Sequence, residues 1–184
     1  LYSLLGLLSL LTTSCAEADP ADQIANYAEI VHGNYRGARL AAQALQSSVG
    51  AFIAAPSSDS LGAARIAWLE ARESYGQTEV FRFYNGPIDG VGPGAGWEEG
   101  IEGPEGRMNA WPLNESFIDY VKGNGRAGIV NDRSLPITLE TIIGRNAISD
   151  ETDVTTGYHA IEFLLWGQDL SVDGPGARDA SDYV

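Results

Sequence analysis

One histidine and one glutamate share a short apolar segment late in the chain, residues 157–167 (GYHAIEFLLWG). We expect this segment to form a helix with Thr155 or Thr156 as its N-cap. Its apolar side chains surround the helix axis, which predicts a buried helix. Residues three apart lie on one helix face, so His159 and Glu162 should point the same way. Because burying an unpaired carboxylate is costly, we expect the pair to meet a hydrogen-bond partner, a proton or a metal ion inside the protein.

A neutral imidazole and a carboxylate on one helix face form half of a divalent metal site. Di-iron bundles use the reverse order, Glu-x-x-His, on two facing helices, whereas this chain carries a single His-x-x-Glu. The other histidine, His32, is interpreted as a structural residue. Further ligands from this chain would then be carboxylates, tyrosines or waters, and such oxygen-rich ligation suits iron, manganese or calcium. On chemistry alone, an isolated His-x-x-Glu is more often a buried hydrogen-bonded pair.

The motif Gly157-x-His159-x-x-Glu162 resembles the G-x-H-x-x-E signature of the imelysin family, and the string GYHAIEFLLWGQDL resembles its iron-regulated branch. Three other strings resemble the same family: YAEIVHGNY at 27–35, QTEVFRFYNGPID at 77–89 and GPEGRMNAWPLNESFIDYV at 103–121. The family includes bacterial envelope proteins tied to iron uptake and is also classed as a metallopeptidase family. The resemblance implies that His159 and Glu162 bind a metal, either iron or another divalent ion, and that a second helical bundle follows in the full-length protein.

Three functions stay open on the sequence. The first and favoured one is an envelope protein that binds iron or an iron complex for uptake, together with other envelope uptake components. The second is a metallopeptidase, which rests on the resemblance alone, because the H-E-x-x-H motif of zinc peptidases is absent. The third is a non-catalytic interaction module of the envelope, in which His159 and Glu162 are polar residues of the core.

The start of the chain predicts export. Residues 1–14 are apolar and uncharged, too short to span a membrane as a helix, and they resemble a signal peptide without its basic start. Cys15 follows a small residue, as at a bacterial lipoprotein cleavage site; the alternatives are ordinary signal cleavage nearby or an inert cysteine. We therefore expect the periplasm or the outer membrane, with membrane contact only through a lipid anchor on Cys15. The net charge of −14 argues against nucleic acid as a partner.

Two long stretches, about 21–55 and 59–83, carry apolar residues at helical spacing. On the second, a face that begins at Trp68 also carries Glu79 and Arg82. This face is either a polar wall of the His159 site or a surface with intrahelical ion pairs. Glu79 and Arg82 are therefore candidates for the pocket. Trp111 and Tyr158 are candidates for shaping it.

The rest of the chain predicts short helices between irregular segments. Residues 85–107 are rich in glycine and proline and should form a long loop. Short helices are expected at about 115–121, capped by Asn114, and at about 139–147, capped by Thr138. The predicted fold is all-α, an up-and-down, four-helix-type bundle with long irregular insertions. Residues 1–15 would be a truncated signal peptide, 16–22 a linker, and 23–184 an imelysin-like helical domain, the first of two bundles and incomplete at its C-terminus.

Overall fold

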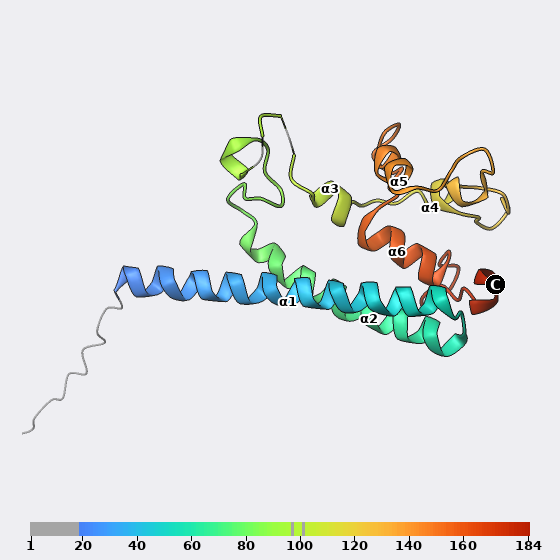
Figure 1. The fold of residues 1–184 in the computed structure, drawn as a ribbon, viewed down its shortest axis with the longest axis horizontal. Coiled ribbons are helices and arrows are strands. Elements are labelled where there is room, and N and C mark those ends of the chain that lie inside the picture. Colours follow the sequence, from blue (N-terminus) through green and yellow to red (C-terminus); the bar gives the residue numbers. More distant parts are fainter. Residues whose placement is uncertain (1–18, 97, 101) are drawn as a thin grey trace, which may run out of the picture.

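The computed structural model describes residues 19–96, 98–100 and 102–184, so the predicted signal peptide and Cys15 lie outside the described residues. Within these ranges the chain forms α-helices and short 3-10 turns but no β-strand, which confirms the all-α prediction (Figure 1). None of the helices in this part is both long and apolar enough to cross a membrane. The α-helices are α1 (Pro20–Ala54), α2 (Ser58–Gly76), α3 (Glu105–Met108), α4 (Glu115–Ile118), α5 (Leu139–Arg145) and α6 (Gly157–Trp166).

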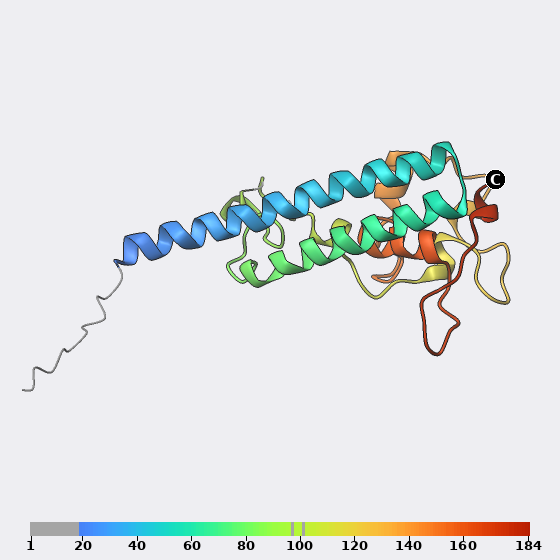
Figure 2. The same ribbon diagram turned by 90° about the horizontal axis from the view of Figure 1, so that it is seen from below.

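The two long predicted helices form an antiparallel hairpin, α1 and α2, which lie side by side in both views (Figures 1 and 2). The side chain of Asp19 caps the first helix by accepting a hydrogen bond from the backbone nitrogen of Ala21 at 2.9 Å. A reciprocal capping box between Ser57 and Ser60 begins the second, with distances of 3.1 and 3.0 Å.

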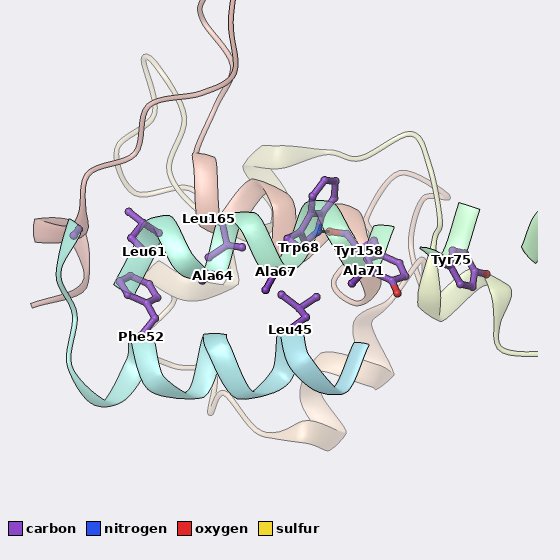
Figure 3. Packing of buried hydrophobic residues seen from close by; sticks show 11 residues of the cluster. Leu45, Phe52, Leu61, Ala64, Ala67, Trp68, Ala71, Tyr75, Tyr158 and Leu165 are labelled. Atoms are coloured by element: carbon purple, nitrogen blue, oxygen red, sulfur yellow. Dashed lines mark hydrogen bonds between the residues drawn. The ribbon is translucent and has the colours of Figure 1, made fainter. Parts of the chain in front are cut away.

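The core lies where α6 packs on this hairpin (Figure 3). Tyr158, at the start of α6, contacts the later part of α2, whereas Leu165, near its end, is bonded by Arg65 from the earlier part. Helices α2 and α6 are therefore antiparallel, so that α1, α2 and α6 run alternately up, down and up. Alanines with no exposed surface, Ala64 and Ala71, lie on the packed side of α2, where small side chains let helices approach closely.

The apolar stripe of α1 is buried only in its second part. Ala38, Leu45 and Phe52 are buried, whereas Ile24 and Tyr27 are exposed. The reason is length, because α1 has 35 residues and α2 has 19. Beyond the end of α2, none of the other α-helices in the described part of the chain lies beside the start of α1 (Figures 1 and 2).

The predicted second helix, 59–83, is too long. The α-helix ends at Gly76 and continues only as a 3-10 turn, Gln77–Phe81. Thr78 is buried, and its hydroxyl donates to the backbone oxygen of Tyr75 at 2.7 Å. Such a side-chain bond to a nearby carbonyl competes with the regular helical bond.

The short helices occur where they were predicted but end earlier. The helix predicted over 115–121 stops at Ile118, because Asp119 adopts an extended backbone. The helix predicted over 139–147 ends at Arg145, and its predicted cap is confirmed: Thr138 accepts from the backbone nitrogen of Thr141 at 3.2 Å. The irregular segment predicted at 85–107 extends to Glu105, where α3 begins.

Candidate functional site

The start of α6 is fixed by the chain segment around α3. Gly157 has a φ of +85°, and a Cβ atom at this position would lie 2.5 Å from the backbone oxygen of Met108. Only glycine combines this left-handed backbone with such a close approach. Thr156 occupies the predicted N-cap position, but its hydroxyl donates to Asn146 Oδ1 at 3.0 Å instead of capping the helix.

Side chains of α2 hold α6 along its length. The indole nitrogen of Trp68 donates to the backbone oxygen of Tyr158 at 2.8 Å. At the other end, Arg65 Nε and Nη2 donate to the backbone oxygen of Leu165 at 3.0 and 2.8 Å, and Nη2 also donates to the oxygen of Arg178 at 2.6 Å. A guanidinium at the C-terminal end of a helix satisfies free carbonyl groups and matches the helix dipole.

His159 and Glu162 lie together on one face of α6. His159 Nδ1 is 3.0 Å from Glu162 Oε2. The side chains are 17% and 42% exposed, respectively, so the helix is not enclosed on every side as its composition predicted. Tyr158 and Leu165 pack against the α1–α2 hairpin, whereas Phe163 lies on another side of α6 and packs with Ile118 of α4. The partner that we expected for the carboxylate of Glu162 is therefore His159. The other ring nitrogen of His159, Nε2, has no hydrogen bond to any described residue.

The exposed face of this pair opens into a cavity of about 360 Å³. Trp111 lies at its edge: the ring is 4.8 Å from that of His159, at an angle of 56°, and the residue is 69% exposed. The structure thus brings Trp111 to the His159 pair. The other lining residues are Trp68, Leu69, Leu113, Glu115, Phe163, Trp166, Gly167, Asp169, Pro175 and Gly176.

Tyr158 does not line this cavity but lies in the core between α2 and α6. Its ring centre is 5.2 Å from that of Tyr75 and 6.4 Å from that of Trp68. Burial raises the pKa of the Tyr158 hydroxyl. Its role is therefore to pack α6, the helix that carries His159, against α2.

Glu79 and Arg82 do not line the cavity either. Arg82 Nη1 donates to the hydroxyl of Tyr75 at 2.8 Å and to Glu105, and Arg82 Nε is 3.5 Å from Asp89. Glu79 joins the same cluster, 3.9 Å from Arg82. These two residues form a polar cluster at the end of α2, separate from the cavity beside α6.

Electrostatics in this cluster favour the charged carboxylate. Burial alone would raise the pKa of Glu105, but hydrogen bonds from Tyr75 and Arg82 and the charge of Arg82 lower it overall. Burial, followed by the bond to Glu105, raises the pKa of Tyr75. The cluster therefore holds a neutral tyrosine between opposite charges, which is an arrangement that joins α2 to α3.

Two further carboxylates line the cavity, Glu115 at the start of α4 and Asp169 after α6. Sequence reasoning missed both, because no sequence pattern shows that the start of α4 and the segment after α6 meet at one cavity. No group of three or more histidine, cysteine, aspartate or glutamate side chains in the described part of the chain is arranged to hold a metal ion. The His159 pair thus offers two donor groups, which is fewer than a closed metal site needs.

Two comparisons with known proteins cover these residues. The profile of the imelysin family, peptidase M75, matches residues 31–184. Iron-regulated protein A from Synechococcus elongatus (strain ATCC 33912 / PCC 7942 / FACHB-805) is 28% identical over 138 residues, which are 75% of this chain and 29% of that protein. The matched part of the chain thus spans less than a third of the relative's length.

Proposed function

Because the chain belongs to the imelysin family, we propose that it is an iron-binding protein of the bacterial envelope and that His159 provides a metal ligand from α6. The observation that carries this proposal is the His159–Glu162 pair at the edge of an open cavity. The name of the relative, iron-regulated protein A, supports iron as the metal.

The geometry of the pair suggests a role for each residue. Glu162 lies beside Nδ1 of His159. In a neutral ring that carries its proton on Nδ1, the Nδ1–H group would donate a hydrogen bond to the carboxylate, and Nε2 would be unprotonated. A carboxylate that accepts from one ring nitrogen orients the histidine and makes the other nitrogen a better ligand. We therefore assign metal binding to His159 Nε2, with Glu162 as the residue that orients the ring.

A single histidine ligand is too few for a stable metal site, so the proposal requires further ligands. Glu115 and Asp169 line the same cavity and are the carboxylates within it that could contribute. Segments outside the described residues could supply others. The cavity is larger than a single ion, which leaves room for bound water or for an iron complex.

The proposal places the protein outside the cytoplasm. The apolar residues 1–14 support export, and Cys15 supports a lipoprotein anchored in the outer membrane. In this setting the partners would be other iron-uptake components of the envelope.

The test is titration calorimetry of the full-length protein with iron and with zinc. We expect specific binding by the parent, its loss in His159→Ala, and an affinity that is about 10-fold to 100-fold lower in Glu162→Gln. The matched control is His32→Ala, which removes the exposed histidine of α1 and should bind like the parent. Binding that His159→Ala retains, or none by the parent, would refute the proposal. Peptide cleavage by the metal-loaded parent would instead favour the metallopeptidase alternative.

A further inference from the structure

We propose that the cavity beside His159 binds an organic cation, a small molecule that carries an ammonium or guanidinium group. The proposal goes beyond metal binding, because it rests on the residues that line the cavity and not on a bound ion. Three features support it: the aromatic walls, the charge of the lining residues and the size of the cavity.

Aromatic side chains form much of the wall. Trp68, Trp111, Phe163 and Trp166 line the cavity. The face of an aromatic ring attracts a cation, and tryptophan does so most strongly. Trp166 already takes part in such a contact in this structure, since the guanidinium of Arg65 lies 5.5 Å from its ring centre.

Among the aromatic residues of the wall, Trp111 is the one most accessible to a ligand. It contacts His159 but is 69% exposed, which is unusual for so large an apolar side chain. An exposed tryptophan at the edge of a cavity can cover a bound molecule without a rearrangement of the core. Trp68, in contrast, is buried and donates to Tyr158, so it serves as a fixed wall.

The charges at the cavity are all negative. Glu115, Glu162 and Asp169 line it, and among the described residues no lysine or arginine does. Arg65 and Arg178, on neighbouring segments, are each occupied with other groups: Arg65 bonds backbone carbonyls, and Arg178 Nη1 bonds Asp119 at 2.7 Å. The Glu115 side chain has no hydrogen bond or ion pair with any described residue, and is therefore available to pair with a cation.

The volume of about 360 Å³ is that of a small-molecule site and exceeds what a single ion needs. An anion would be repelled by the three carboxylates. An uncharged apolar ligand would cover Glu115 and leave its carboxylate without a partner, which is costly. An ammonium or guanidinium group would pair with a carboxylate and stack on an indole at the same time.

The test is a titration of the full-length protein with agmatine, which carries both a guanidinium and an ammonium group. Binding is measured by tryptophan fluorescence and by calorimetry. We expect saturable binding of agmatine and none of glutarate, a dianion of similar length. Trp111→Ala should weaken agmatine binding about tenfold and Trp111→Phe by less, because phenylalanine keeps an aromatic face. Glu115→Gln should also weaken it about tenfold, since charge-assisted bonds are the stronger ones.

Glu73→Gln is the matched control, because it removes the same charge from an exposed position of α2 and should leave the affinity unchanged. Both cavity variants change accessible side chains, so circular dichroism should show a folded protein. Failure of the parent to bind agmatine, or equal binding by Trp111→Ala and Glu115→Gln, would overturn the proposal. An iron titration of Trp111→Ala separates the two functions, because we expect this variant to bind iron like the parent.

Discussion

Gly157 lies against the backbone oxygen of Met108 so closely that a Cβ atom at position 157 would be 2.5 Å from it. The glycine of the G-x-H-x-x-E motif therefore has a structural task. It allows the first turn of α6 to touch the end of α3, and this contact sets the position of His159 two residues later. The histidine and glutamate of the motif face the cavity, whereas the glycine determines where that cavity can form.

Replacing Gly157 with alanine should lower the free energy of unfolding by about 2 kcal/mol or more, because the new methyl group meets a backbone atom and φ is positive. Urea unfolding measures the change. Gly37→Ala is the control, since Gly37 lies within α1 with no atom near its Cβ position. Alanine at position 37 should raise the free energy of unfolding by at most about 1 kcal/mol. Equal effects of the two substitutions would show that the contact with Met108 does not restrict position 157.

Arg65→Met should lower the free energy of unfolding by about 2–4 kcal/mol, because three hydrogen bonds to the carbonyl groups of Leu165 and Arg178 are lost. Arg39→Met removes an arginine of α1 whose only hydrogen bond to a described residue is with Gln43, at 3.2 Å, and should change stability by less than about 0.5 kcal/mol. Chemical denaturation of both variants tests the difference. An Arg65 variant as stable as the Arg39 variant would mean that the end of α6 does not depend on this side chain.

Asp119→Asn should lower the free energy of unfolding by about 3 kcal/mol, because it removes the charge of the carboxylate nearest to the buried Arg178. The two side chains are 7% and 3% exposed and are 2.7 Å apart. Asp182 is also near Arg178, but at 3.8 Å and with 35% of its side chain exposed, so Asp182→Asn should cost less than about 1 kcal/mol. Thermal unfolding of the two variants tests this order, and the reverse order would contradict it.

Stability should fall in acid partly through Glu105. Its pKa in the folded protein is lowered from the ordinary 4.5, because the bonds from Tyr75 and Arg82 outweigh the effect of burial. Its contribution to stability is therefore complete above about pH 4.5 and is lost as the pH falls through the lower, folded value. Glu105→Gln should flatten the loss of unfolding free energy between about pH 5 and 3. Glu102→Gln, at an exposed position, should leave the slope unchanged, and two equal slopes would rule out this linkage.

Periodic features of the sequence predicted most of the fold. Apolar spacing placed α1 and α2, a short apolar segment indicated α6, and capping residues such as Thr138 located the start of a short helix. The spacing of His159 and Glu162 predicted their contact, because residues three apart meet on a helix. These features depend on neighbours in the chain, which is why they can be read without the fold.

The composition of the cavity depends on tertiary structure and was predicted less well. Glu79 was expected near the site because it shares a helix face with Trp68. A helix rises about 1.5 Å per residue, however, so a separation of eleven residues corresponds to roughly 16 Å along the axis. Glu115, at the start of α4, and Asp169, after α6, line the cavity, but no sequence pattern connects them with His159. Residues on one helix face can thus belong to different sites, and residues that no sequence pattern connects can belong to the same site.

The bond from Arg65 to Leu165 joins positions 100 residues apart. The α1–α2 hairpin, in contrast, needs only the short connection at Ala55–Ser57. Closing a long loop costs more chain entropy than closing a short one and slows folding. The hairpin can therefore form early, whereas the cavity exists only after the late docking of α6. A partly folded chain would keep most of its helix content and still have no binding site.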